Sequence, residues 1–292
     1  MKICGFTFVR NAVKYDYPVV ESITSILPIV DEFIVSVGNS DDGTLSLIES
    51  INSRKIKIVH SVWDDSLKEG GHVLAAETDK AMAFIPASFD WAFYLQADEV
   101  VHEKYLDTIV AAAKKYKDID EVEGLLFKYV HFYGSYDYTG DSRRWYDHEI
   151  RLIKNNGNIR SYKDAQGFRT REDKKLQVKE IDAYIYHYGW VRHPNKQFQK
   201  IVDFSGLWNG SDYTPAPHKE ENEFDFFKDA DSVKLFSGTH PAVMQKRITE
   251  KNWKASFDIT KKKFSLKDGL LYRLEKLTGK RLFTYKNYKI LR

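Results

Sequence analysis

Cysteine is almost absent from this sequence, which holds a single one, Cys4, among 292 residues. One thiol cannot form a disulfide within the chain, so a disulfide framework is excluded and a reducing, cytoplasmic compartment is favoured. Long apolar runs are absent as well, since none approaches the roughly 18 residues that cross a bilayer. Residues 2–9 favour a strand and lack the pattern of a signal peptide. We therefore expect a cytoplasmic protein in which Cys4 is buried and unreactive.

Negative charge is scarce at the end of the chain. Residues 261–292 contain eleven Lys or Arg and two Asp or Glu, a local charge of +9, whereas residues 1–260 carry −6. The acidic body argues against nucleic-acid binding by the main domain. The basic tail makes an anionic membrane surface a candidate partner, which would place the protein peripherally on the inner face of the membrane.

Hydrophobic periodicity predicts alternating strands and helices over the first 130 residues. Strands are expected at 3–9, 33–37, 56–60, 91–95 and 125–130, and helices at 16–27, 45–51, 72–84 and 103–117. This alternation indicates an α/β layered domain with a mainly parallel sheet, in which ligands bind beyond the carboxyl ends of the strands. Residues 131–240 are expected to be irregular apart from a strand at 149–153, and residues 241–292 are expected to be helical and then basic.

Two acidic residues, Asp98 and Glu99, follow the strand at 91–95. Carboxylates at this edge suit a hard divalent cation such as Mg²⁺ or Mn²⁺, which one or two carboxylates and the phosphates of a substrate can hold. The alternative is an acidic strand end in solvent. A second polar cluster, residues 38–44, follows the strand at 33–37. It either contacts a nucleobase or ribose or is an ordinary capped turn.

Taken together, these segments resemble family 2 glycosyltransferases with a GT-A fold. The resemblance is close over residues 1–130 and extends to residues 186–192. Five segments carry it in the family's order: Val9-Arg10-Asn11, Gly38-Asn39-Ser40-Asp41-Asp42-Gly43-Thr44, Ala76-Glu77-Thr78-Asp79-Lys80-Ala81-Met82, Trp91-Ala92-Phe93-Tyr94-Leu95-Gln96-Ala97-Asp98-Glu99 and Tyr186-His187-Tyr188-Gly189-Trp190-Val191-Arg192.

The resemblance implies an α/β fold of the GT-A type, a Rossmann-like mixed sheet flanked by helices. It implies a catalytic domain at 1–240, with a donor-binding half at 1–130 and an acceptor half at 131–240, and then a helical basic extension at 241–292. The expected activity is metal-dependent transfer of a hexosyl-like sugar from a nucleotide-diphosphate donor to a glycan or lipid-linked glycan. Direct displacement with inversion, in surface polysaccharide biosynthesis, is the implied setting. The alternative is a non-catalytic sugar-nucleotide or glycan-binding protein of the same fold.

The resemblance also implies site residues on the donor side. The nucleotide-binding candidates are Phe8, Arg10, Asn39, Asp41, Asp42, Asp79 and Gln96, and the metal candidates are Asp98, Glu99 and His187. Gln96 departs from the family, because it replaces the first Asp of an Asp-x-Asp motif, and Thr78 and Asp79 replace an Arg and an Asn. Gln96 cannot supply charge, which is the feature that favours the binding-protein alternative.

Residues 144–153 lie where the related enzymes build the acceptor pocket. A general base must take the proton of the acceptor hydroxyl. The candidates are Glu149 first, then Asp147, His148 and Asp164, and the acceptor-binding candidates are Trp145, Arg151, Trp190 and Arg192. Two alternatives stay open: Glu149 and Arg151 form a pair that only orders the segment, and the tryptophans pack in the core.

The predicted helix in the basic tail has a stripe of leucines. It comprises Leu266, Leu270, Leu274 and Leu277, with Lys267, Arg273 and Lys276 assigned to the opposite face. The default interpretation is that the stripe packs on the catalytic domain, and a membrane-surface helix or an oligomer contact are the alternatives. A nucleotidyltransferase or a dehydrogenase is disfavoured, because no glycine-rich loop follows the first strand and no Gly-x-Gly-x-x-Gly follows any strand.

Overall fold

The computed structural model describes residues 1–64, 66–67, 71–209, 218–219 and 222–292. The strands are β1 (Ile3–Val9), β2 (Glu32–Val37), β3 (Ile56–His60), β4 (Trp91–Tyr94), β5 (Glu99–Val101), β6 (Gly124–Tyr133), β7 (Ser135–Gly140), β8 (His148–Lys154), β9 (Ile159–Tyr162), β10 (Gly167–Thr170), β11 (Leu176–Trp190), β12 (His218–Lys219), β13 (Glu223–Phe224), β14 (Val233–Leu235) and β15 (Tyr288–Ile290). The helices are α1 (Val19–Ile26), α2 (Thr44–Glu49), α3 (His72–Ala83), η2 (Glu103–Tyr105), α4 (Leu106–Tyr116), α5 (Pro194–Asn209), α6 (Phe226–Asp229), η4 (Ala242–Met244), α7 (Gln245–Thr249) and α8 (Leu266–Thr278).

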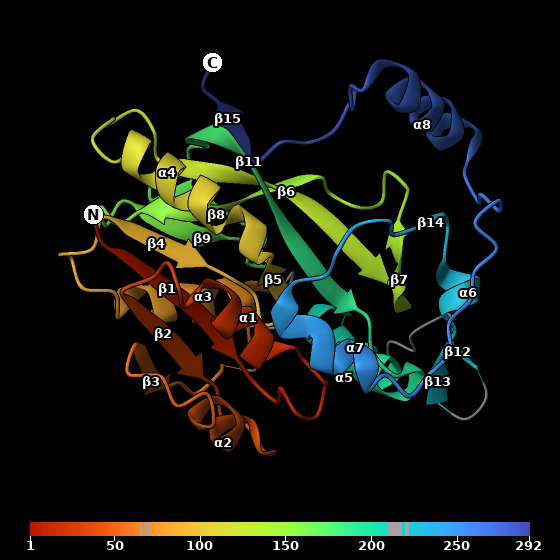
Figure 1. Ribbon diagram of the computed structural model, residues 1–292, viewed down its shortest axis with the longest axis horizontal. Helices are drawn as coiled ribbons and strands as arrows, with labels where there is room; N and C mark the ends of the chain where they lie inside the picture. Colours follow the sequence, from red (N-terminus) through yellow and green to blue (C-terminus); the bar gives the residue numbers. More distant parts are fainter. Residues whose placement is uncertain (65, 68–70, 210–217, 220–221) are drawn as a thin grey trace.

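One large sheet organises the molecule (Figure 1). Its strand order is β14-β7-β6-β8-β4-β1-β2-β3, and β11 adds to it by pairing with β6, β5 and β15. Strands β3, β2, β1 and β4 are mutually parallel, whereas β8 lies antiparallel between β4 and β6. The five strands expected in the first 130 residues are β1, β2, β3, β4 and β6. The α/β fold with a mixed sheet flanked by helices is therefore confirmed.

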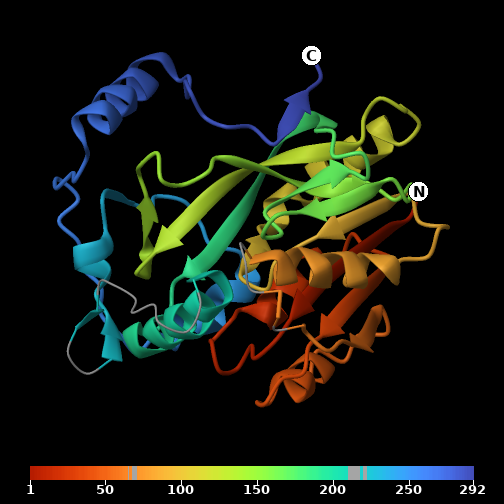
Figure 2. The ribbon, with the colours of Figure 1, turned by 180° about the vertical axis from the view of Figure 1, so that it is seen from behind.

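The central strands are apolar because helices cover both faces of the sheet. Helices α1, α2 and α4 cover one face, where Ile23, Ile48 and Ile109 join the core of β1 and β2. Helix α3 and the β9–β10 hairpin cover the other face, where Ala81 and Phe168 pack against strand side chains. Figure 2 shows α3 in front of the sheet on this second side. The three layers leave the carboxyl ends of β1 and β4 uncovered for the site described below.

The middle of the chain is more regular than its sequence suggests. Residues 131–240 contribute β7 to β11, α5 and β14, so the prediction of an irregular region was wrong. The 15-residue strand β11 escaped notice because its register against β6 shifts twice, between Glu180 and Tyr184 and between His187 and Trp190. Each shift disrupts the two-residue alternation by which strands are recognised.

The C-terminal region leaves the body of the protein and then returns to it. Helix α8 lies at the edge of the molecule in both views, and β15 rejoins the sheet beside β11 (Figures 1 and 2). No residue of α8 is buried, and its leucine stripe does not pack on the domain, so the default interpretation of the stripe was wrong. Across the described residues, no helix is both long and apolar enough to span a bilayer.

Candidate functional site

A cleft of about 450 Å³ lies beyond the carboxyl ends of β1 and β4. It is walled by loops and strands from both halves of the chain. The side chains that line it include Phe8, Arg10, Tyr17, Trp63, Leu74, Gln96, Asp98, His131, Arg144, Trp145, Tyr146, Asp164, Gln166, His187, Trp190, Gln197, Lys200 and Phe204. This is the edge at which the strand order predicts ligand binding.

Asp98 and His187 meet in the cleft because short strand β5 pairs with β11. Glu99 of β5 lies opposite His187 of β11, which puts Asp98 at the adjoining position. The amide of Tyr188 donates to the backbone carbonyl of Asp98 at 2.8 Å. Gly189 is required here, since a Cβ on it would lie 2.5 Å from Nε2 of His187 and 2.8 Å from Oδ2 of Asp98. The Tyr186–Arg192 segment therefore supplies both the imidazole and the space beside it.

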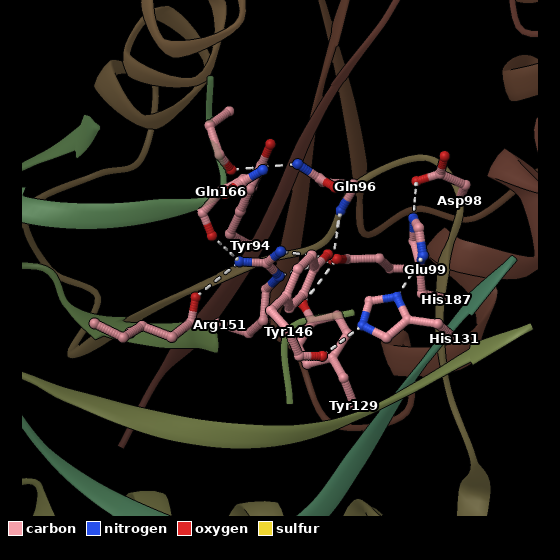
Figure 3. Close-up of polar contacts among 12 residues, drawn as sticks. Tyr94, Gln96, Asp98, Glu99, Tyr129, His131, Tyr146, Arg151, Gln166 and His187 are labelled. Atoms are coloured by element: carbon pink, nitrogen blue, oxygen red, sulfur yellow. Dashed lines mark hydrogen bonds and ion pairs between the residues drawn. The ribbon is translucent and has the colours of Figure 1, made fainter. Parts of the chain in front are cut away.

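A chain of hydrogen bonds fixes the tautomer of His187 (Figure 3). Nε2 of His131 lies 2.7 Å from the carbonyl oxygen of Tyr146, which can only accept, so this nitrogen donates. Burial lowers the pKa of both imidazoles, so both are neutral. Nδ1 of His131 must then accept from Nδ1 of His187, 3.0 Å away. Nε2 of His187 is left with a free lone pair, which faces Asp98.

Two electron-pair donors thus face each other across the cleft floor. Nε2 of His187 is 3.8 Å from Oδ1 of Asp98, which is too long for a hydrogen bond. A lone pair opposite a carboxylate is unfavourable unless a cation lies near both. An imidazole held by a hydrogen bond from its other nitrogen is the usual arrangement of a metal-ligating histidine.

Lys200 of α5 supplies one positive charge at this place. Its Nζ lies 3.3 Å from Oδ2 of Asp98, and its side chain is 17% exposed. Burial and the neighbouring Arg192 lower the pKa of Lys200 to about 8, although Asp98 opposes the change. Burial alone would raise the pKa of Asp98, but the neighbouring cations, Lys200 first and then Arg192, lower it to about 2. Asp98 is therefore ionised at neutral pH and attracts cations.

Glu99, the neighbouring carboxylate, points the opposite way into the protein. Its side chain and that of Arg151 are both fully buried. Arg151 binds it through two bonds of 2.8 Å, the hydroxyl of Tyr129 donates to it at 2.7 Å, and the amide of Gln96 donates at 3.1 Å. Four donors leave this carboxylate no capacity for a metal ion.

The structure fits a divalent cation with two protein ligands, Asp98 and His187. Mg²⁺ and Mn²⁺ commonly take one or two protein ligands and complete their coordination with substrate phosphates and water. The converging lone pair and carboxylate meet that requirement, and Glu99 falls outside it. No group of three or more His, Cys, Asp or Glu side chains suited to a metal occurs in the described parts of the chain.

Gln96 has a structural role that an aspartate could not fill. Its Nε2 donates to the carbonyl of Ala165 at 3.2 Å, and Arg151 donates to the carbonyl of Gln166 at 2.9 Å (Figure 3). Both bonds hold the loop that carries Asp164. Lys163 and Ala165, which flank Asp164, have φ values of 55° and 63°. Left-handed backbone at two non-glycine positions on either side of one residue costs energy and is found mainly where a side chain must be held for function.

The three carboxylates considered as the base lie in different places. Asp164 lines the cleft, and burial raises its pKa. Asp147 lies outside that lining, 3.2 Å from His148 in an ion-pair geometry. Glu149 also lies outside it, with Oε2 buried and without a hydrogen-bond partner among the described residues. Burial raises the pKa of Glu149 to about 8, so it is a neutral acid inside the protein.

The nucleotide-side candidates divide in the same way. Phe8, Arg10 and Gln96 line the cleft, together with Trp63, whose ring lies 5.6 Å from that of Phe8. Asn39, Asp41, Asp42 and Asp79 do not line it. Asp42 accepts from the amides of Lys14 and Thr44, as the capped-turn alternative requires. Asp79 accepts from the amide of Ser161 and holds β9 on α3.

Among the acceptor-binding candidates, the two tryptophans line the cleft and the two arginines do not. Trp145 and Trp190 are in its wall, and the guanidinium of Arg144 lies 5.2 Å from both rings. Arg192 is fully buried and donates to the carbonyls of Tyr15 and Gly189. Arg151 is the partner of Glu99.

Several cleft residues carried no signal in the sequence. His131 and Tyr146 lie in or next to strands whose register is visible only after folding. Lys200 lies in the polar first turns of α5, where lysine is common on any exposed helix face. Trp63 follows β3 and could have been noticed only as an isolated aromatic residue. The place of each in the cleft becomes evident only from the residues that the fold brings next to it.

Comparison with known proteins gives structural likeness only. No family model and no curated protein matches the chain. S. aureus TarS 1-349 in complex with UDP aligns over 73% of this chain and 67% of its own, with 13% identity and a TM-score of 0.43. The chain covers 39% of a longer S. aureus TarS structure.

Two other solved structures show comparable likeness. Glucosyl-3-phosphoglycerate synthase from Mycobacterium tuberculosis, in complex with Mn²⁺, UDP and phosphoglyceric acid, aligns over 44% of this chain and 43% of its own, with 17% identity and a TM-score of 0.31. The 4-diphosphocytidyl-2C-methyl-D-erythritol synthase from Anaerococcus prevotii aligns over 70% and 94%, with 12% identity and a TM-score of 0.39. These matches assign neither a family nor a substrate to this chain.

Proposed function

We propose that this protein transfers a sugar from a nucleotide-diphosphate donor to a hydroxyl acceptor. The observation that carries the proposal is the convergence of the Asp98 carboxylate and the free lone pair of His187, 3.8 Å apart, at the strand ends that line the cleft. These two side chains would hold Mg²⁺ or Mn²⁺. When bound, the ion would neutralise the charge that develops on the leaving diphosphate.

The chain's own residues supply the remaining requirements. Lys200 presents a second positive charge beside Asp98, where a diphosphate would bind. Phe8, Arg10 and Trp63 form the wall proposed for the nucleoside, and Trp145 and Trp190 form the wall proposed for the acceptor sugar, whose apolar face can stack on an indole. The two walls face one cleft, so donor and acceptor would meet above Asp98.

Asp164 is the proposed general base. Among the described cleft-lining residues, Asp98 and Asp164 are the carboxylates, and Asp98 is committed to cations. One available carboxylate suits a single displacement, in which the base takes the acceptor proton while the hydroxyl attacks the anomeric carbon. A single displacement inverts the configuration at that carbon. We propose a glycan or lipid-linked glycan as acceptor, in surface polysaccharide biosynthesis.

The test is a transfer assay with the purified protein. A panel of sugar nucleotides is incubated with and without Mn²⁺, and release of nucleoside diphosphate is measured. We expect release from at least one donor, and we expect Asp164→Asn to lower kcat by about 10²- to 10⁴-fold, the usual contribution of a general base. Asp147→Asn, which removes a nearby carboxylate outside the cleft, should change kcat by less than about threefold.

The non-catalytic alternative gives a different result in the same experiment. A binding protein would show calorimetric binding of a nucleoside diphosphate and no turnover with any donor or acceptor. Gln96 supported that alternative in the sequence, but its bond to Ala165 gives it a structural purpose that is equally compatible with catalysis. Equal loss of kcat in the Asp147 and Asp164 variants would reject the proposed base.

A further inference from the structure

Helix α8 exposes the apolar side chains that an ordinary surface helix would bury. Leu266 is 97% exposed, Leu270 60%, Leu274 37% and Leu277 84%. Just beyond the helix, Phe283 is 90% exposed. Contiguous apolar surface of this kind on a folded protein marks an interaction site rather than a chance exposure.

The helix is bound to the body through its polar face. The hydroxyl of Tyr272 donates to Asp141 at 2.5 Å, Lys276 pairs with the same carboxylate at 2.8 Å, and Glu275 pairs with Arg143 at 2.6 Å. Residues 272, 275 and 276 share one side of a helix that turns about 100° per residue. Residues 266, 270 and 277 lie within about 40° of one another on the other side. The leucine face is therefore directed outward.

Positive charges border this outward face. At about 100° per residue, Lys267 and Arg273 lie on either side of the leucines, so of the three basic residues expected opposite the stripe only Lys276 is there. Lys267, Arg273 and Lys280 are exposed, and their side chains form no ion pair within the described chain. Apolar residues flanked by unneutralised lysine and arginine are the pattern of a helix that lies in a membrane interface.

We propose that α8 docks the protein on an anionic lipid bilayer. The leucines and Phe283 would enter the boundary between headgroups and acyl chains, and the flanking cations would contact anionic headgroups. A second copy of the chain is a poor occupant of the same face. Residues 261–292 carry a net charge of +9, which would oppose +9 on the partner copy.

Through its polar face, helix α8 adjoins the side of the cleft proposed for the acceptor. A smaller pocket of about 220 Å³ lies between them, lined by Tyr272 and Glu275 of α8 and by His131, Trp145 and Tyr146, which also line the main cleft. A bilayer at α8 would bring lipid-linked acceptors close to this wall. That consequence rests on the proposed function, whereas the lipid contact itself does not.

The experiment is co-sedimentation of the full chain with vesicles. One set contains phosphatidylcholine alone, and the other contains about 30% phosphatidylglycerol. We expect binding to the anionic set at least about tenfold tighter than to the neutral set, and weaker binding in 0.5 M salt than in 0.1 M salt. Leu266→Gln/Leu270→Gln/Leu277→Gln should reduce binding at least about tenfold. Glutamine keeps helix propensity, and circular dichroism verifies that the variant is folded.

Two further variants separate the causes. Lys267→Gln/Arg273→Gln/Lys280→Gln should lose most of the preference for anionic vesicles, since each such charge contributes about fivefold near the surface. Val62→Gln/Leu235→Gln removes apolar residues that are 74% and 56% exposed elsewhere, and should bind like the wild type. Unchanged binding by a folded triple-leucine variant overturns the proposal. A second result also overturns it. In that result the wild type is a dimer in light scattering, does not bind vesicles, and becomes monomeric when the leucines are replaced. Neither result bears on sugar transfer, which the release assay tests separately.

Discussion

Asp98 and Glu99 are adjacent in the sequence and both are buried, but their side chains point to opposite sides of the same turn, one to the cleft and one to the core. The cleft side holds Asp98, whose partners are the ammonium of Lys200 and the unprotonated nitrogen of His187. The core side holds Glu99, which four hydrogen bonds satisfy completely. The contrast teaches that burial of an acid is uninformative about its role. What separates a binding group from a scaffold group is whether its acceptor capacity is already filled.

The largest effect is expected from removing the charge on the cleft side. Asp98→Asn keeps the shape of the side chain and removes the charge that would hold a metal ion, so kcat should fall by about 10³-fold or more, or about 4 kcal/mol in the activation barrier. Stability measured by urea unfolding should fall by less than in the Glu99 variant below. A variant that retains wild-type kcat and Mn²⁺ response would contradict the assignment of Asp98.

On the core side, replacing the carboxylate of Glu99 by an amide of the same shape should lower stability. Glu99→Gln leaves the guanidinium of Arg151 buried without a negative partner, which typically costs about 3 kcal/mol or more. Urea unfolding should show this loss, and Arg151→Met in the Glu99→Gln background should restore part of it. If Glu99→Gln instead abolished activity with unchanged stability, the division between the two sides would be incorrect.

Glu149 extends the comparison to a third buried carboxyl, one with no cation of its own. Its pKa is raised to about 8, chiefly by burial, against about 4.5 in an unfolded chain. Between these pH values the folded state holds a proton that the unfolded state has lost, so stability falls as pH rises across that window. Glu149→Gln should flatten this slope and stabilise the protein by about 4 kcal/mol at pH 8, since each unit of pKa shift corresponds to about 1.4 kcal/mol. Denaturant titrations of the wild type and the variant at pH 5 and pH 8 measure the change in unfolding free energy with pH. The same change in both proteins would show that Glu149 is ionised in the folded state.

The smallest effect is expected at Gln96, whose backbone amide donates to Glu99 on the core side and whose side chain donates to Ala165 beside the cleft. Gln96→Glu cannot donate to the carbonyl of Ala165, so the loop that carries Asp164 should loosen. We expect kcat to fall about tenfold and stability by about 1 kcal/mol, the worth of one hydrogen bond. Gln166→Glu is the matched control, because it adds the same charge to the same cleft and leaves the Ala165 contact in place. Identical kinetics in the two variants would mean that charge, and not the lost donor, causes the effect.

The fold of residues 1–130 could be predicted from the sequence because its signals are local. Strand and helix periods over residues 1–130 are regular, and their alternation indicates a mainly parallel sheet. The position of Asp98 beside the cleft was predictable for the same reason, since it follows closely on a hydrophobic strand. Residues 131–292 lack such signals, because β11 contains register shifts and α8 faces its leucines outward. Helix period alone cannot tell which face meets the protein.

The individual site residues were harder to predict because their roles depend on partners far away in the chain. Glu149 was favoured as the base on strand position and resemblance, yet the cleft contains Asp164, which is 15 positions further on in a turn with no periodicity. Asn39, Asp41 and Asp42 form a motif-like cluster that the structure uses as a turn. Lys200, 102 positions after Asp98, is brought to it only by the packing of α5.

The bond from His131 to the carbonyl oxygen of Tyr146 has an evolutionary consequence. The oxygen that sets the tautomer of His187 belongs to the main chain, so no substitution at position 146 can delete it. A different side chain at position 146 would therefore still leave the acceptor that sets the proton order of the two imidazoles. Under the proposed function, a change in this part of the cleft wall would keep the lone pair of His187 directed at Asp98.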